Sequence, residues 1–193
     1  MGYTFFAIQV VLKTYPGDNL RARLHQIITT SPSEVSLVEK RAFYKSLTSV
    51  LNEGMASFER GFWDLIRGRD AERQFETWCS EIEGSIATEP EEIDDVADEL
   101  HRISNEKEFV IASLIFLLEE GSTSDDILAA RCDMPEREYF TRQTFGNLLG
   151  AIPALSFATV KADAVYLVPG TDQDGLSSLD LAEEGYAYLR LLS

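Results

Sequence analysis

Apolar residues alternate with polar or weakly apolar ones in two segments near the ends of the chain. Every second position from 6 to 12 is strongly apolar, which is the period of a strand that buries one face. The same period returns over 160–168, where Lys161 and Asp163 separate apolar positions. We therefore predict one strand near each end of the sequence.

Between these strands, apolar residues mostly recur at the helical spacing of about 3.6 residues. One amphipathic segment covers 20–28, and a second covers 35–51 after a cap predicted within 31–33. A third helix is predicted over 70–86. A fourth, with a strongly acidic outer face, is predicted over 90–103.

Two further apolar segments are interpreted as strands. Glycines at positions 54, 61 and 68 interrupt any long helix there, so the apolar residues of 62–66 predict a short strand. Residues 109–118 are apolar on every side, and their β-branched residues favour a buried strand over a helix.

Capping signals divide the rest of the chain into short helices. A serine at 124 is expected to start a helix over 124–131, and the Asp, Pro and Glu residues of 133–136 start a longer helix that ends near Gly150. A serine at 177 or 178 is expected to cap a last short helix.

Helices and strands alternate along the sequence without a glycine-rich crossover signature. This order predicts an α+β fold, with a small mixed or antiparallel sheet of about four strands covered by helices. The sequence shows no internal repeat, low-complexity tract or linker, so we assign residues 1–193 to a single α+β domain.

Acidic residues outnumber basic ones, with 33 Asp and Glu against 17 Lys and Arg and a formal net charge of −16. Residues 1–75 carry ten basic and eight acidic residues, a net charge of +2, so the excess of acid lies in 76–193. Because nucleic-acid affinity depends on cationic side chains that displace counterions, we expect no nucleic-acid partner.

The basic residues of the first part include arginines interleaved with aromatic residues. Such a segment suits an anionic membrane surface or an acidic protein partner, because aromatic rings lodge at headgroup depth and guanidinium groups pair with anions. The alternative is that each arginine neutralises a neighbour such as Asp64, Asp70 or Glu72. The predicted docking patch consists of Arg60, Phe62, Trp63, Arg67, Arg69 and Arg73.

Residues that carry catalysis or bind metals are scarce. The histidines are His25 and His101, and the cysteines are Cys79 and Cys132. A Cys79–His101 dyad has no support from spacing, and Cys79 lies on an apolar helical stripe, where an inert thiol is typical. The acidic turn at 172–175 fails to match a calcium loop at two informative positions. We therefore predict no catalytic residues, no cofactor and no bound metal.

The spacing of elements within 113–149 resembles that of a helix-turn-helix, with 136–149 as the helix that would read DNA. The charges argue against this interpretation. Two glutamates accompany the two arginines of that helix, and three aspartates come shortly before it.

No segment has the pattern of a secretory signal peptide or a membrane span. Residues 1–11 are apolar but lack a positively charged start and a small-residue cleavage site. The longest apolar run, 109–118, is about half of the roughly 20 residues that a helix needs to cross a bilayer. The chain is therefore expected to be soluble.

Stretches along most of the chain match the pattern of one known family. Residues 8–12 and 20–28 are similar to its Leu-Gln-Val-x-Leu-Leu start and following helix, and 30–33 are similar to its Thr-Ser-Thr-Pro-Glu turn. Residues 108–111 are similar to its Glu-Tyr-Ile-Val strand, and 149–191 share its Gly-Ala-Ile-Pro, Val-Pro and Glu-Gly-Tyr motifs. On these motifs the chain resembles the cyanobacterial and chloroplast family of domain of unknown function 1517, which includes the chloroplast fluctuating-light acclimation proteins.

The resemblance implies a function through association rather than through catalysis. The family has no established catalytic residues, and its members typically carry a membrane-anchoring segment and a Gly-rich region ahead of this domain. It therefore implies association with a membrane, on the thylakoid or cytoplasmic side, and a role in photosynthetic-membrane acclimation.

From these observations we predict a non-enzymatic interaction or regulatory domain that acts at or near a membrane surface. Its predicted partner is a protein or an anionic membrane surface. The alternatives are a helix-turn-helix regulator that uses 113–149, and a small-ligand-binding enzyme.

Overall fold

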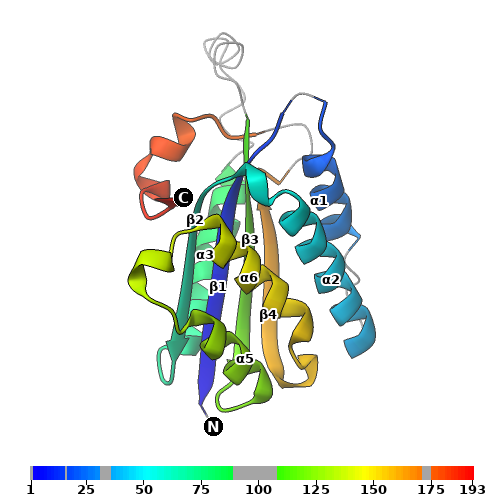
Figure 1. Cartoon of the computed structure of the whole chain (residues 1–193), viewed down its shortest axis with the longest axis vertical. Coiled ribbons are helices and arrows are strands. Elements are labelled where there is room, and N and C mark those ends of the chain that lie inside the picture. The colour runs from blue at the N-terminus through cyan, green and yellow to red at the C-terminus, as the bar shows by residue number, and fades with distance from the viewer. Residues whose placement is uncertain (1, 16, 31–35, 89–107, 171–174) are drawn as a thin grey trace.

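The computed structural model describes residues 2–15, 17–30, 36–88, 108–170 and 175–193. Within these residues, five antiparallel strands form one sheet in the order β4-β3-β1-β2-β5 (Figure 1). The strands are β1 (Tyr3–Lys13), β2 (Phe58–Arg67), β3 (Phe109–Glu119), β4 (Val160–Val168) and β5 (Arg190–Leu191).

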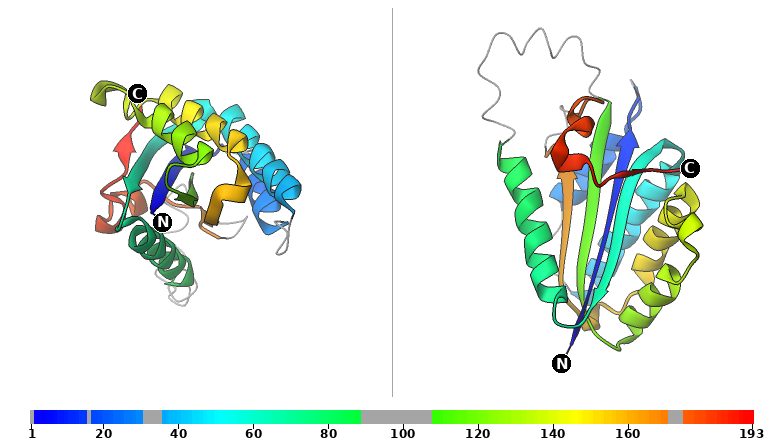
Figure 2. Two further views of the ribbon diagram at one scale, coloured as in Figure 1. Left: turned by 90° about the horizontal axis from the view of Figure 1, so that it is seen from below. Right: turned by 90° about the vertical axis from the view of Figure 1, so that its left-hand side faces the viewer.

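Helices cover both faces of this sheet (Figures 1 and 2). One face carries α1 (Leu20–Thr29), α2 (Leu37–Glu53), α5 (Thr123–Cys132) and α6 (Arg142–Ala151). The other face carries α3 (Ala71–Thr88) and the C-terminal segment, residues 175–193, which adds Leu181 and Leu189 to the same apolar cluster. The sheet is therefore the middle layer of three.

The side chains of β1 alternate between two apolar cores. Phe6 and Ile8 belong to the core under α1, α2, α5 and α6, whereas Phe5 and Val11 belong to the core under α3. All residues from 4 to 12 are buried, because β1 lies between two strands and between two layers. This position explains why the intervening residues of the strand are mostly apolar as well.

The predicted α+β class is confirmed. The strands predicted at 6–12, 62–66, 109–118 and 160–168 correspond to β1, β2, β3 and β4, and the sheet is antiparallel. The sheet has one strand more than expected, because the two-residue β5 pairs with β2 near the end of the chain.

Two helices start from a different residue than predicted. Ser36 caps α2 in a capping box, in which Glu39 N donates to Ser36 Oγ at 3.3 Å and Ser36 N donates to Glu39 Oε2 at 2.9 Å. The cap predicted within 31–33 lies outside the described residues. Ser122, not Ser124, caps α5 by accepting a backbone N–H. Serines two positions apart carry the same capping chemistry, so the sequence alone does not separate them.

The helix predicted to start within 133–136 ends near Gly150 as expected, but its predicted start is wrong. The first residue of that segment ends α5, and Glu136–Glu138 form a single 3-10 turn. Thr141 caps α6, which starts at Arg142. Asp and Pro favour a turn that ends a helix as much as a cap that starts one, which explains the error.

The C-terminal segment forms turns instead of the predicted short helix. Ser177 does act as a cap, since Asp180 N donates to Ser177 Oγ at 3.2 Å. Two 3-10 turns come after it, Asp180–Ala182 and Glu184–Tyr186. The acidic helix predicted over 90–103 lies outside the described residues.

The hydropathy of the described helices bears on whether any of them could cross a membrane. None combines the length and the apolar character that crossing requires.

Candidate functional site

The second face of the sheet holds a pocket between α3 and the C-terminal segment, which we call the α3 pocket. Gln9, Ile111 and Val168 form its floor on the sheet, and Ile82 and Ser85 of α3 form part of its wall. Its volume is about 300 Å³, at the small end of the range for ligand sites.

Three aromatic rings form one side of the α3 pocket. The ring centroids of Phe62 and Trp78 are 5.9 Å apart, those of Phe62 and Tyr188 are 5.6 Å apart, and those of Trp78 and Tyr188 are 6.4 Å apart. The rings come from β2, α3 and the C-terminal segment, so their contacts hold these three elements together. Aromatic packing therefore gives the pocket a defined wall.

A chain of hydrogen bonds crosses the floor of the α3 pocket. The Tyr188 hydroxyl donates to Gln9 Oε1 at 2.8 Å, and Gln9 Nε2 donates to Ser113 Oγ at 2.9 Å. Gln9 is only 3% exposed, so these bonds offset the cost of burying its amide. Burial raises the pKa of Tyr188 to about 12, and its hydroxyl therefore stays a donor at neutral pH.

Two carboxylates border the α3 pocket, Asp64 from β2 and Glu81 from α3. Asp64 Oδ1 accepts the backbone N–H of Leu65 at 2.8 Å, and burial raises the pKa of Asp64 above its ordinary value. Neither carboxylate forms an ion pair with any residue that the structure describes. A half-buried carboxylate of this kind is a candidate for contact with a ligand.

Both cysteine side chains are partly buried. Burial is the main cause that raises the pKa of Cys79 on α3, and it raises the pKa of Cys132 to about 12. Since the thiolate is the reactive form, both groups are poor nucleophiles at neutral pH, in line with the expectation of an inert thiol at Cys79. His101, the partner in the Cys79–His101 dyad, lies outside the described residues.

We expect Cys79 and Cys132 to resist alkylation in the folded protein. Burial raises the pKa of both thiols and limits access to them, so iodoacetamide at pH 8 should react roughly tenfold or more slowly than with the unfolded chain. Timed quenching and intact-mass measurement, with the chain in concentrated urea as the reference, gives both rates. Equal rates in the two states would contradict this picture.

The aromatic residues of the predicted docking patch do not share a surface. Phe62 and Trp63 are neighbours on β2, so their side chains point to opposite faces of the sheet. Phe62 lines the α3 pocket, whereas Trp63 packs against the other core and its Nε1 donates to Tyr139 O at 2.9 Å. The two rings therefore cannot insert together into one membrane surface.

Three of the four arginines of the patch are bonded to other groups of the protein. Arg60 donates to a backbone carbonyl of the C-terminal segment at 3.0 Å, and Arg73 pairs with Asp70 at 2.7 Å. Arg69 is exposed in the turn between β2 and α3. Arg73 therefore follows the alternative stated in the sequence analysis, in which an arginine of the patch neutralises an acidic neighbour.

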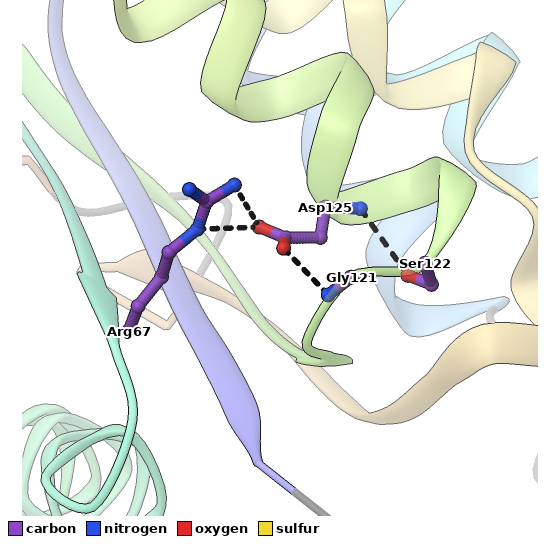
Figure 3. A network of polar contacts seen from close by, with 4 residues as sticks. All are labelled: Arg67, Gly121, Ser122 and Asp125. Carbon is purple, nitrogen blue, oxygen red and sulfur yellow. Dashed lines mark hydrogen bonds and ion pairs between the residues drawn. The ribbon is translucent and has the colours of Figure 1, made fainter.

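Arg67 belongs to a network that joins the end of β2 to the start of α5 (Figure 3). Its Nε and one terminal nitrogen donate to Asp125 Oδ1 at 3.0 and 2.9 Å. Asp125 Oδ2 accepts the N–H of Gly121 at 2.8 Å, and the N–H of Asp125 donates to Ser122 Oγ at 3.3 Å. The carboxylate is 2% exposed, so the network fixes the turn between β3 and α5 rather than offering Arg67 to a partner.

The segment 113–149 is not a helix-turn-helix. Its first residues belong to β3, and α6 lies on the sheet with Phe145, Leu148 and Leu149 in the core. In a helix-turn-helix, a turn of about three to four residues joins the two helices. Here residues 133–141, which include a 3-10 turn, separate α5 from α6, so the spacing of the two helices does not match the motif.

Side chains that could ligate a metal are not clustered in the described part of the chain. These residues contain no group of three or more His, Cys, Asp and Glu side chains placed to hold a metal ion. Residues 172–174 of the acidic turn compared with a calcium loop lie outside the described residues.

Among the residues that line the α3 pocket, the sequence singles out only Phe62 as a candidate site residue, and it does so for a different surface. Asp64 stands out there only as a neighbour of the arginines, and Tyr188 carries no signal at all. Gln9 does carry one, because it is a polar residue at the centre of an otherwise apolar strand.

Comparison with protein-family models, with curated proteins and with solved structures finds no match to this chain. The resemblance to domain of unknown function 1517 therefore stays a prediction. The function of the chain has to be inferred from the geometry of the α3 pocket.

Proposed function

We propose that the chain is a non-enzymatic interaction domain that binds a small organic group, free or displayed by a partner, in the α3 pocket. The observation that carries this proposal is a cavity of about 300 Å³ where three aromatic rings meet a buried, hydrogen-bonded amide. Apolar walls with a few fixed polar groups are the usual form of a ligand site.

Two polar groups of the α3 pocket, the Tyr188 hydroxyl and the Gln9 amide, suit binding rather than acid–base catalysis. Acid–base catalysis needs a side chain that titrates near the working pH. Burial raises the pKa of Tyr188 to about 12, away from neutrality, so its hydroxyl stays protonated. The Gln9 amide does not titrate at all, and it serves to orient a ligand.

The proposal keeps the interaction part of the function predicted from the sequence and leaves out the membrane part. The membrane part depended on the patch of arginine and aromatic side chains and on the resemblance to domain of unknown function 1517, which stays a prediction. With Phe62 and Trp63 on opposite faces and Arg67 held by Asp125, that patch gives no support to docking on a membrane.

Filling the α3 pocket with an added ring should abolish binding. Ser85 is exposed on α3 and lines the pocket, so Ser85→Phe places a phenyl group there without disturbing either core. Ser80, exposed on the same helix and outside the pocket, provides the matched control Ser80→Phe. A ligand at ten times its Kd stabilises the folded state by about 1.4 kcal/mol. A library of small organic compounds, screened by thermal denaturation, is expected to yield compounds that stabilise the wild type and Ser80→Phe but not Ser85→Phe.

Two outcomes of this screen would contradict the proposal. One is a complete lack of stabilising compounds, and the other is equal stabilisation of Ser85→Phe and the wild type. Compounds that bind are expected to be recovered unchanged. Chemical conversion of a bound compound would instead favour the alternative of a ligand-binding enzyme.

A further inference from the structure

The α3 pocket brings aromatic rings and carboxylates to one place. Phe62, Trp78 and Tyr188 line it with their centroids within 6.4 Å of one another. The π face of an aromatic ring carries partial negative charge and attracts a cation, most strongly where water is excluded. Asp64 and Glu81 add two formal negative charges at the same cavity.

These two carboxylates are not neutralised by the described part of the protein. No described Lys, Arg or His lies within ion-pair distance of Asp64 or Glu81. The hydrogen bond that Asp64 accepts comes from the neighbouring Leu65 N–H and uses Oδ1. A cationic ligand would therefore supply the missing counter-charge.

The elements around the pocket are acidic as well. The C-terminal segment has three acidic residues and one arginine, a net charge of −2. Helix α3 has four glutamates and one arginine, a net charge of −3, from Glu72, Arg73, Glu76, Glu81 and Glu83. Such a field concentrates cations near the pocket and repels anions.

The rest of the lining decides which kind of cation fits. Ile82, Ile111 and Val168 present apolar surface, which accommodates alkyl groups but cannot coordinate a metal ion. Calcium needs about six to eight oxygen ligands, more than two carboxylates and an amide provide. An organic cation satisfies the charged and the apolar parts of the pocket together.

We infer that the ligand of the α3 pocket is an alkylated ammonium ion, held by the aromatic rings and by the charge of Asp64. The inference rests on the proposed function, because it names the ligand class of the same pocket. The cation is either a free small molecule or the alkylated lysine side chain of a partner protein, and both present the same head group.

Choline and its neutral isostere 3,3-dimethylbutan-1-ol form a matched pair of probes. The two have the same shape and differ in charge, so a cation site should bind choline roughly tenfold or more tightly. A peptide with trimethyllysine, titrated beside the same peptide with norleucine at that position, tests a displayed cation in the same way. Preference for the charged member of either pair supports the inference. Absence of that preference in both pairs overturns it.

Asp64→Asn tests the proposed counter-charge. This change keeps the size of the side chain and an oxygen for the Leu65 N–H, and is expected to weaken binding of the charged probe roughly tenfold. Asp70→Asn removes the same charge outside the pocket and should change the affinity less than about twofold. Equal weakening by both variants would show that only the net charge of the protein attracts the probe, and would overturn the inference. Glu81→Gln tests the second carboxylate of the pocket in the same way. Glu81 is on an exposed part of α3, so this change does not alter the sheet.

The library screen with Ser85→Phe separates this inference from the proposed function. If neutral compounds bind in a way that Ser85→Phe abolishes, while neither charged probe is preferred, the cation inference fails and the proposed function stands. If no compound and no probe binds to the wild type, both fail.

Discussion

Replacement of Asp125 by alanine is expected to lower the free energy of unfolding by about 2–4 kcal/mol. The Asp125 carboxylate is 2% exposed and accepts hydrogen bonds from Arg67 and from the N–H of Gly121 (Figure 3). Its removal leaves a guanidinium group and a backbone donor without their acceptor. The Arg67 side chain is 44% exposed, so water recovers part of the loss, and the expected effect stays below that of a fully buried pair.

The neighbouring residue gives the control for this prediction. Asp126 occupies the same first turn of α5 but is exposed, so Asp126→Ala should cost less than about 1 kcal/mol. Reversible urea denaturation of both variants measures the difference. If Asp125→Ala cost no more than Asp126→Ala, the network would not be holding the turn between β3 and α5.

Substitution of alanine for Gly61 is expected to cost about 2–3 kcal/mol. Gly61 lies on β2 beneath α6, and an added Cβ would come within 2.7 Å of Phe145 Cζ and 2.9 Å of the backbone oxygen of Gln9. The strand cannot move away from that oxygen without breaking its pairing with β1. The same change at Gly84, in the C-terminal half of α3, meets nothing within 4 Å and should be neutral or stabilising by up to about 1 kcal/mol.

A smaller partner should relieve part of the strain at Gly61. In the double variant Gly61→Ala/Phe145→Leu, the ring that the new methyl group strikes is gone, so the combined loss should be smaller than the sum of the single losses. Denaturation of the two single variants and the double variant gives the three free energies of unfolding that this double-mutant cycle compares with the wild type. Strict additivity would indicate that the methyl group and the ring do not meet.

Much of the sheet could be predicted from the sequence because its central strands carry their own pattern. β1 and β3 are long and apolar, and each occupies an interior position where both faces are buried. β5 has no such signal, since Arg190 and Leu191 are exposed and only their pairing with β2 defines them as a strand. Pairing of this kind depends on the tertiary fold and is not visible in a short sequence window.

The two aromatic residues of the predicted docking patch lie on different faces of the sheet, for a reason that the sequence already contained. Neighbouring residues of a strand point to opposite faces, and the strand predicted over 62–66 includes both aromatic residues of the patch. Phe62 and Trp63 could therefore not share one surface, and the strand prediction itself excluded their cooperation. Grouping side chains by closeness in sequence is sound on an exposed loop, but it is misleading on a buried strand.

The α3 pocket could not be predicted, because its residues are far apart in the sequence. Gln9, Asp64, Trp78 and Tyr188 come from four separate elements, and no spacing relates them. Gln9 could be noticed in the sequence, because it is a polar residue within the apolar strand β1. Its partner Tyr188 becomes apparent only when the C-terminal segment folds back onto the sheet.

NMR mapping of a bound compound tests most directly whether the α3 pocket is the binding site. The chain has two tryptophans, Trp78 in the pocket and Trp63 on the opposite face of the sheet, and Trp63→Phe assigns their indole N–H signals. On titration with a stabilising compound, the Trp78 indole and the Gln9 side-chain amide should shift together, while the Trp63 indole stays in place. A shift of the Trp63 indole, with Trp78 and Gln9 unchanged, would place the ligand elsewhere and contradict the proposed function.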